Sequence, residues 1–291
     1  MQYRRLGRTG LDVSAVSIGG AYLAGPDADR IQENATALVR RALELGVNYI
    51  DTAPLYGDSE TLLGQALKGV QQPFYLSSKI GFKPEGFDYK RDSVLRSIER
   101  SLGLLGLEKL AVAQIHEVNL AGWERIVEPG GTLEGLRAAQ ARGWCDYIGI
   151  TGRAIPLLAR LAATGEFDTL LVYHDYHPCL QLAAREVLPT AAAQDMGVVA
   201  ATVLAGGLYV DGQEEEGLGR LEDEAARGRC RGILARLREE DSTLPQSAFR
   251  YVLGDDRVST VSSGAATLAQ LEEVLRAGDM APLPGAEIGV G

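Results

Sequence analysis

Residues 48–57 read Asn48-Tyr49-Ile50-Asp51-Thr52-Ala53-Pro54-Leu55-Tyr56-Gly57. Apolar residues lead into the carboxylate of Asp51, after which a proline and a glycine break the run. The segment that follows, 59–69, has the apolar spacing of a helix. The stretch therefore predicts a strand, a tight polar loop and a helix, with an acid and the phenol of Tyr56 at the open end of the strand.

The next two strand-like runs also end in residues that can move or hold protons. The first ends at Lys79 and the second at His116. A phenol with an ordinary pKa of roughly 10 is a slow proton donor or base at neutral pH, and a nearby ammonium lowers that pKa. Three consecutive strand ends thus carry Asp51 with Tyr56, then the lysine, and then the histidine. This arrangement indicates an acid–base site.

Composition and charge limit the class of protein. The chain has 291 residues, of which 46% are apolar, and this is enough to form a buried core. No apolar run approaches the roughly 18 residues of a membrane span, and the N-terminus lacks a signal-peptide core. The net charge of −10 disfavours a nucleic-acid partner. The cysteines (Cys145, Cys179 and Cys230) lack metal-ligand spacing, so we expect reduced thiols and a cytoplasmic location.

Short apolar runs alternate with helix-period segments along the chain. At the start, residues 2–6 and 11–14 flank Gly7-Arg8-Thr9-Gly10, which predicts a β-hairpin within residues 1–15. The predicted strands then cover 16–20, 47–51, 74–79, 110–116, 146–150, 168–173, 197–202 and 258–262. The predicted helices cover 33–45, 59–69, 91–105, 132–142, 155–164, 182–195, 228–238, 244–253 and 267–276.

This unbroken repeat favours one α/β domain over residues 1–291, a (β/α)8 TIM barrel with an N-terminal β-hairpin and a tail at 277–291. A doubly wound sheet is the alternative, but no Gly-x-Gly-x-x-Gly follows the first strand. In a barrel the carboxyl ends of all strands meet at one mouth, where such enzymes carry out their chemistry. The four polar residues would then converge.

Segment 203–227 departs from the repeat. It is rich in glycine and contains Glu214-Glu215-Glu216. We interpret it as a long loop, either a flexible connection in solvent or a lid over a bound ligand.

Together these motifs resemble those of the aldo-keto reductases along nearly the whole chain. The opening 3–11 is similar to the entry hairpin of that family, and Asp51-Thr52-Ala53 with Tyr56-Gly57 and Ser59-Glu60 is similar to its most characteristic motif. The further matches, in the family's order, are Ser78-Lys79, Ile115-His116, Tyr147-Ile148-Gly149-Ile150 and Gln270-Leu271-Glu272-Glu273. The segments Ala200-Ala201 and Gly206-Gly207-Leu208 most resemble those of bacterial sugar dehydrogenases that oxidise aldoses such as fucose or galactose.

The resemblance implies an NAD(P)-dependent oxidoreductase that interconverts an aldehyde, ketone or aldose and its alcohol or lactone by hydride transfer. Its catalytic tetrad would be Asp51, Tyr56, Lys79 and His116. Tyr56 would give or take the proton with help from Lys79, and His116 would orient the substrate oxygen. Asp51 would hold the lysine in place, and the cofactor would carry the hydride.

The same resemblance implies which residues meet the ligands. The expected cofactor-binding residues are Gly20, Thr151, Gly152, Thr202, Leu204, Gly206, Ser262, Gly264, Ala266 and Gln270. Tyr22, Trp123 and His174 are expected in a small-molecule carbonyl or sugar pocket, although plain loop packing explains Tyr22 and Trp123 equally well.

Three departures from the family concern the cofactor. Thr151-Gly152-Arg153 stands where many members have a Ser-Asn pair, and Ala201 replaces an aromatic residue that often stacks on the nicotinamide. Tyr173 or His174 could replace that ring. Residues 262–270 lack the cation that pairs with the 2′-phosphate of NADP, which favours NAD, unless Arg153 or Arg229 supplies the charge.

Two other classes of function compete with this one. A non-catalytic regulatory subunit on the same fold is disfavoured because all four tetrad positions are filled. A metal-dependent barrel hydrolase would need ligands such as His174 and His177, but these follow a strand and lack clustered carboxylates, so no metal is expected. Because barrel specificity lies in loops, the sequence predicts neither the individual substrate nor the oligomeric state.

Overall fold

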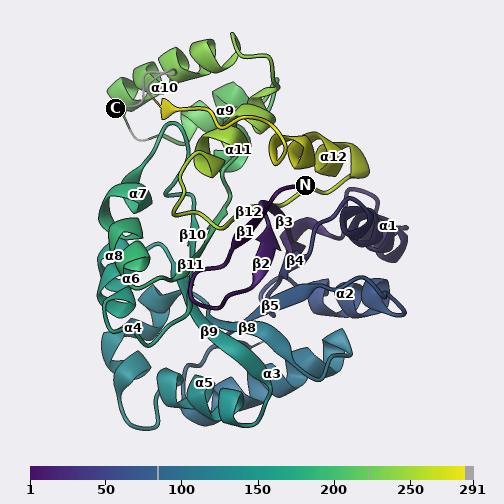
Figure 1. Ribbon diagram of the computed structural model, residues 1–291, viewed down its shortest axis with the longest axis vertical. Coiled ribbons are helices and arrows are strands. Elements are labelled where there is room, and N and C mark those ends of the chain that lie inside the picture. Colours follow the sequence, from purple (N-terminus) through teal and green to yellow (C-terminus); the bar gives the residue numbers. More distant parts are fainter. Residues whose placement is uncertain (84, 222, 286–291) are drawn as a thin grey trace.

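Eight parallel strands form a closed barrel in the computed structural model, which describes residues 1–83, 85–221 and 223–285 (Figure 1). In chain order they are β3 (Val16–Gly19), β4 (Tyr49–Asp51), β5 (Tyr75–Ile80), β8 (Leu110–Ile115), β9 (Cys145–Gly152), β10 (Thr169–Tyr173), β11 (Gly197–Ala201) and β12 (Thr260–Ser263). Each pairs with its neighbour in the chain, and β12 closes the barrel against β3. The predicted (β/α)8 fold is confirmed.

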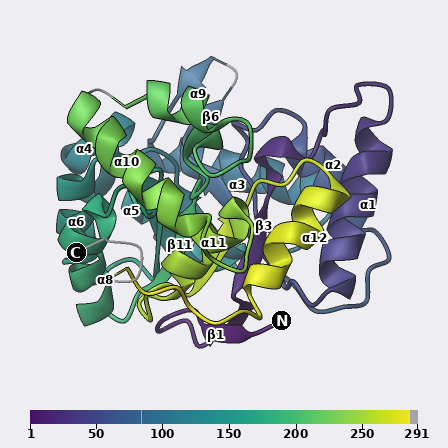
Figure 2. The ribbon, with the colours of Figure 1, turned by 90° about the horizontal axis from the view of Figure 1, so that it is seen from above.

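An antiparallel hairpin covers the amino end of the barrel, as predicted. Its strands are β1 (Tyr3–Arg5) and β2 (Asp12–Ser14). Leu6 and Val13 belong to the small apolar cluster inside the barrel, and Gly7 forms a bridge with Met196 just before β11. Figure 2 shows β1 at the opposite end of the molecule from β6 and α9. The hairpin therefore closes the barrel and leaves the carboxyl ends of the strands open.

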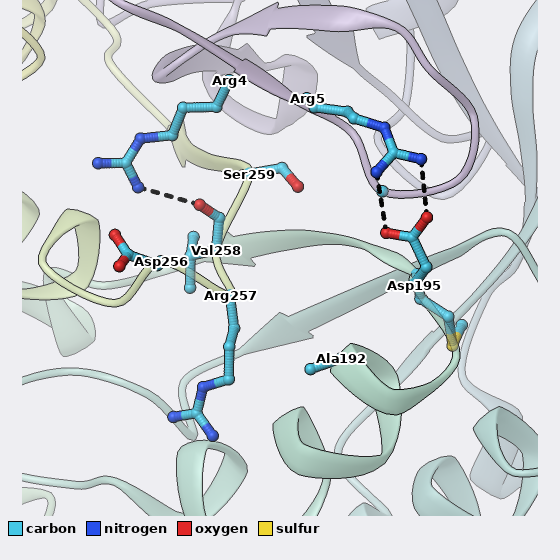
Figure 3. A pocket seen from close by; sticks show the side chains of 10 residues that line it. Arg4, Arg5, Ala192, Asp195, Asp256, Arg257, Val258 and Ser259 are labelled. Atoms are coloured by element: carbon cyan, nitrogen blue, oxygen red, sulfur yellow. Dashed lines mark hydrogen bonds and ion pairs between the residues drawn. The ribbon is translucent and has the colours of Figure 1, made fainter.

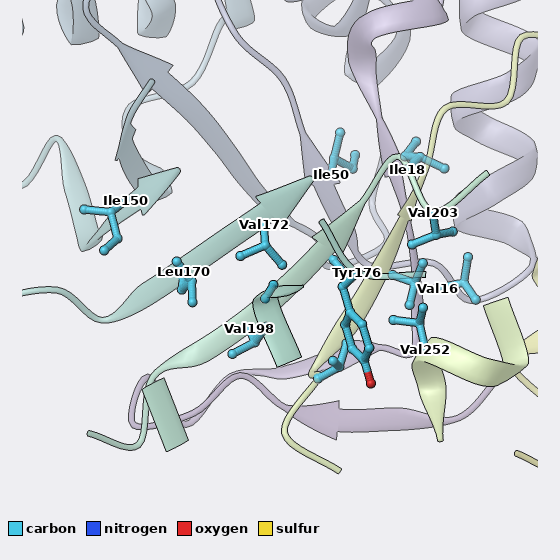
Figure 4. Packing of buried hydrophobic residues seen from close by; sticks show 14 of the residues in the cluster. Val16, Ile18, Ile50, Ile150, Leu170, Val172, Tyr176, Val198, Val203 and Val252 are labelled. Atoms are coloured by element: carbon cyan, nitrogen blue, oxygen red, sulfur yellow. The ribbon is translucent and has the colours of Figure 1, made fainter. Parts of the chain in front are cut away.

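Helices surround the barrel. They are α1 (Ile31–Glu44), α2 (Ser59–Leu67), α3 (Arg91–Leu105), α4 (Val118–Val127), α5 (Thr132–Ala141), α6 (Ile155–Ala162), α7 (Leu182–Glu186), α8 (Leu188–Ala193), α9 (Glu214–Gly219), α10 (Glu224–Leu237), α11 (Leu244–Leu253) and α12 (Leu268–Ala277), with the 3₁₀ turns η1 (Gly20–Tyr22) and η2 (Ala205–Gly207). Strand residues such as Ile50, Val172 and Val198 are buried in the large apolar cluster under this layer (Figure 4). Since strand residues alternate between faces, the neighbours of Ile50, Tyr49 and Asp51, face the barrel interior.

Segment 203–227 is not the predicted long loop. It contains η2, α9 and the first turn of α10, with residue 222 outside the described ranges. Three glutamates occupy the first turn of α9, where the helix dipole favours negative charge. Asp223 caps α10 by accepting from the backbone nitrogen of Ala226 at 2.6 Å. Charge at the two helix starts thus outweighs the glycine content that predicted a loop.

The structure differs from the predicted pattern at three further places. The expected helix 182–195 is divided into α7 and α8, because Pro189 at the start of α8 cannot donate a backbone hydrogen bond. The pattern also missed α4, in which Gly122 has non-helical backbone angles. A short ribbon of β6 (Phe82–Lys83) and β7 (Gly86–Phe87) was not predicted either.

The chain after α12 packs back onto the body. Within the expected tail 277–291, Leu283 is buried and its backbone nitrogen donates to the Arg250 carbonyl at 3.3 Å. Residues 286–291 lie outside the described ranges. No helix in those ranges combines the length and apolar character that a membrane crossing requires.

We predict that Gly7→Ala lowers the free energy of unfolding far more than Gly10→Ala. Both glycines have positive φ, +49° and +70°, so each alanine carries a backbone cost of about 1–2 kcal/mol. A Cβ on Gly7 would overlap the backbone of Met196 and Gly197, whereas one on Gly10 meets no atom within 4 Å. Overpacking adds about 1–3 kcal/mol. Urea unfolding of both variants measures the difference; equal losses would show that the hairpin is not clamped against β11.

Candidate active site

A buried ion pair lies at the carboxyl ends of β4 and β5. Lys79 Nζ donates to Asp51 Oδ2 at 2.5 Å and to the Thr52 carbonyl at 3.0 Å. The lysine is 1% exposed and the aspartate 4%. Burial lowers the pKa of Lys79, but the Asp51 carboxylate and the nearby Tyr56 raise it by more. The carboxylate therefore keeps the buried lysine charged, where an unpaired ammonium would be costly.

Gln114 holds the second oxygen of the aspartate. Its Nε2 donates to Asp51 Oδ1 at 3.0 Å and to Ser77 Oγ at 2.6 Å. Gln114 stands two residues before His116, and Ser77 stands two before Lys79. Because strand residues with a spacing of two share a face, both lie inside the barrel beneath the ion pair. The sequence analysis missed these residues, although this spacing could have identified them.

The ring of Tyr56 lies beside this pair and against His116. Lys79 Nζ is 4.8 Å from the centroid of the Tyr56 ring, and the imidazole meets that ring edge-on with 5.8 Å between centroids. Burial raises the pKa of the phenol and Lys79 lowers it, with burial the larger effect. Lys79 lowers the pKa of Tyr56 as expected, but burial and the Asp51 charge together raise it by more. The phenol stays protonated at neutral pH.

His116 carries a neutral imidazole. Burial and the Lys79 charge lower its pKa to about 3. The ring nitrogen Nδ1 is buried without a hydrogen-bond partner among the described residues. The backbone is fixed instead: its nitrogen donates to the Ile80 carbonyl at 3.0 Å, and its carbonyl accepts from the Tyr89 hydroxyl at 2.5 Å. The imidazole is thus positioned by the main chain and can hydrogen-bond a ligand oxygen.

The residues expected to hold a dinucleotide lie at the same end of the barrel. They are Gly20 after β3, Thr151 and Gly152 at the end of β9, Thr202, Leu204 and Gly206 after β11, Ser262 in β12, Gly264 and Ala266 after it, and Gln270 in α12. Their positions on four strand ends form an arc around the mouth, which is the arrangement that a long ligand requires.

The segment after β11 has a backbone suited to an anion. Thr202, Ala205, Gly206 and Gly207 all have positive φ. Consecutive residues near such conformations can direct backbone N–H groups into a shared concavity that binds phosphate. Arg220 packs so close to Gly206 that a Cβ there would overlap its guanidinium. The sequence analysis did not single out this arginine, because its approach depends on the path of the segment.

A buried hydroxyl without a partner lies at the end of β9. Thr151 is 1% exposed, and its Oγ1 has no hydrogen-bond partner in the described part of the chain. Buried polar atoms of this kind are uncommon and normally meet a ligand or a water. The Thr151 hydroxyl thus has hydrogen-bonding capacity that no described side chain or backbone group uses.

The three expected pocket residues have different environments. Tyr22 is 62% exposed, and its ring lies against Gly264. His174 follows β10 with a φ of +62°, and burial and Arg153 lower its pKa. Trp123 instead faces the Arg160 guanidinium of α6 at 3.6 Å. The structure thus groups the first two with the strand ends and places Trp123 in the helical layer.

A separate hollow of about 550 Å³ lies at the amino end of the barrel, beside the hairpin (Figure 3). Arg5 donates to Asp195 at 2.7 Å, and Arg4 donates to the Val258 carbonyl at 3.0 Å. These arginines join the hairpin to the barrel. Because they are held by protein partners far from the ion pair, we place no active site there.

Comparisons with known proteins agree with this architecture. The model of the Aldo/keto reductase family matches residues 15–289. L-galactose dehydrogenase from Arabidopsis thaliana is 30% identical over 282 residues, covering 94% of this chain and 86% of that protein. D-threo-aldose 1-dehydrogenase from a Pseudomonas species is 28% identical, covering 91% and 89%. The solved holo form of an aldo-keto reductase from Bacillus halodurans has a TM-score of 0.79 at 27% identity, covering 99% and 94% of the two chains.

The closed barrel with a charged mouth and these relatives define an oxidoreductase enzyme. The chain belongs to the aldo/keto reductase family. The predicted resemblance to its sugar dehydrogenases is confirmed, and the family uses nicotinamide cofactors. Of the three classes of function that the sequence left open, the comparisons support the oxidoreductase.

Proposed function

We propose that the protein transfers hydride between a nicotinamide dinucleotide and the carbonyl carbon of an aldose or related aldehyde, with Tyr56 as proton donor and acceptor. The buried Lys79–Asp51 pair, with the Tyr56 ring 4.8 Å from the ammonium, carries this proposal. The sugar dehydrogenases among the relatives support the substrate class. We further propose that the chain acts as a single domain in the cytoplasm.

Side chains of the site have complementary roles in this reaction. The bound cofactor supplies or accepts the hydride. Reduction leaves negative charge on the carbonyl oxygen, and the protonated Tyr56 hydroxyl can neutralise it. Lys79 stabilises the phenolate that remains, while Asp51 keeps the ammonium beside it. The neutral His116 imidazole hydrogen-bonds the carbonyl oxygen and orients it toward the tyrosine.

The unpartnered and strained groups around the mouth fit the dinucleotide. We assign the Thr151 hydroxyl to its nicotinamide amide. The backbone of 202–207 would hold the diphosphate, because its N–H groups are donors to negative charge. The Arg220 guanidinium would add a positive charge beside Gly206, because its partner Glu216 is exposed and can release it. Gly20 leaves space in the crowded turn after β3, where a Cβ would overlap the hydroxyls of Ser59 and Thr52.

The loop after β12 favours NAD. Ala266 donates from its backbone nitrogen to the Gln270 side-chain oxygen at 2.9 Å, so this loop presents a neutral amide where a 2′-phosphate would need a cation. Arg153 does not offer a free charge, because it pairs with Asp175 at 3.1 Å. Arg229 lies on the exposed side of α10.

We predict that Tyr56→Phe lowers kcat at least about 100-fold, the usual effect of losing a general acid–base group. The phenyl ring keeps its packing against Lys79 and His116, so dinucleotide affinity should change less than about twofold. Steady-state turnover of an aldose and a fluorescence titration with NADH measure the two effects. A variant with near-normal kcat would remove Tyr56 from the proton transfer.

We predict that Lys79→Met moves the limb of the pH profile along which alcohol oxidation rises with pH to higher pH. Lys79 opposes the effect of burial, so its removal raises the pKa of Tyr56 further. Oxidation needs the deprotonated phenol, and the rate at a given pH therefore falls. Lys79→Met combined with Asp51→Asn is the control, because it avoids an unpaired buried carboxylate. If the limb does not move in an active variant, a different group titrates.

We predict that kcat/KM with NAD at least equals kcat/KM with NADP. Each missing charge-assisted hydrogen bond to the 2′-phosphate costs about 1.5–3 kcal/mol, equivalent to about tenfold or more in affinity. Gln270→Arg should therefore raise the NADP value about tenfold and leave the NAD value nearly unchanged. Kinetics with both dinucleotides and one aldose test this. A strong NADP preference in the unmodified protein would show that another residue supplies the cation.

A further inference from the structure

Glu117 follows His116 in an unusual backbone conformation. Its φ of 58° and ψ of 70° are left-handed, which residues other than glycine rarely adopt. The Tyr89 hydroxyl braces this turn by donating to the carbonyls of His116 at 2.5 Å and Glu117 at 3.3 Å. Strained residues that a structure holds in place gather at functional sites. The strain at Glu117 therefore calls for a functional explanation.

One carboxylate oxygen of Glu117 accepts a hydrogen bond and the other does not. The Tyr173 hydroxyl donates to its Oε1. Its Oε2 has no hydrogen-bond partner among the described residues and is not fully buried. The carboxylate also lies close enough to Tyr56 to raise the pKa of that phenol. An open acceptor is thus available near the reacting group.

The charge of Glu117 is not neutralised by an ion pair within the described residues. The neighbouring cations are already paired: Lys79 with Asp51 at 2.5 Å, Arg153 with Asp175 at 3.1 Å and Arg220 with Glu216 at 2.7 Å. His116 and His174 are neutral at pH 7 because their pKa values are lowered. Glu117 thus forms no ion pair among the described residues, and Arg153, the arginine whose pKa it raises, is already bound to Asp175.

We propose that Glu117 determines specificity: it accepts a hydrogen bond from a hydroxyl next to the reacting carbonyl, and it rejects substrates that carry a phosphate or carboxylate within a few carbons. A carboxylate is an acceptor only, and its hydrogen bonds to hydroxyl donors are strong. The same charge repels a second anion in a site of low dielectric. The substrate class is thus a neutral polyhydroxy aldehyde, an inference that rests on the proposed function.

Three aldehydes of the same carbon skeleton test this: glyceraldehyde, propanal without hydroxyls, and glyceraldehyde 3-phosphate. The unmodified protein should prefer glyceraldehyde over both others in kcat/KM. Glu117→Gln keeps the acceptor for Tyr173 but loses the charge. It should reduce the preference over propanal about tenfold and reduce the rejection of the phosphate about tenfold. Far-ultraviolet circular dichroism and the thermal midpoint, each matching the unmodified protein, show that the variant is folded.

Glu124→Gln is the matched control, because Glu124 is an exposed carboxylate on α4, the helix that begins directly after Glu117. It should leave all three values unchanged. An equal loss for every aldehyde in Glu117→Gln, unchanged ratios, or the same shift in the control would overturn the specificity role and leave the proposed function standing. Failure of the unmodified protein to reduce any of the three with either dinucleotide would overturn both.

Discussion

The buried ion pair between Lys79 and Asp51 is the interaction on which the rest of the site depends. A buried pair is weak evidence for stability, since well-packed apolar residues of similar volume often stabilise a core as well or better. Breaking such a pair is far more costly than replacing it, so the surroundings must hold both charges. Gln114 and the Thr52 carbonyl do so here, at 3.0 Å each. The cost of this arrangement points to chemistry rather than to folding as its reason.

The barrel interior changes from apolar at its amino end to polar at its carboxyl end, where it holds that pair. At the amino end, Leu6 and Val13 of the hairpin extend an apolar cluster into the barrel. Toward the carboxyl end the inward positions become polar, with Ser77 and Gln114 directly beneath the aspartate. The apolar end excludes water and closes the barrel. The polar end receives its charges only where strand ends, loops and ligands can satisfy them.

Strand and helix positions could be predicted from the sequence because apolar periodicity and strand-end residues are local signals. The departures have equally local causes: Gly122 interrupts α4, Pro189 divides α7 from α8, and acidic residues start α9. The residues of the site could be predicted from the sequence only in part. The alternation of residues within strands would have predicted that Gln114 faces the barrel interior. The approach of Arg220 to Gly206 depends instead on the path of a segment with strained backbone angles. No periodicity encodes such a path.

Charge around Tyr56 also bears on the direction of the proposed reaction. Burial and Asp51 raise the pKa of the phenol, Glu117 adds to this, and Lys79 alone opposes them. The protonated phenol is therefore the stable form at neutral pH, and it is the form that gives a proton to a reduced carbonyl. Oxidation of an alcohol needs the phenolate, which becomes available only as the pH rises toward the elevated pKa. One set of fixed charges thus favours reduction at neutral pH and oxidation at alkaline pH.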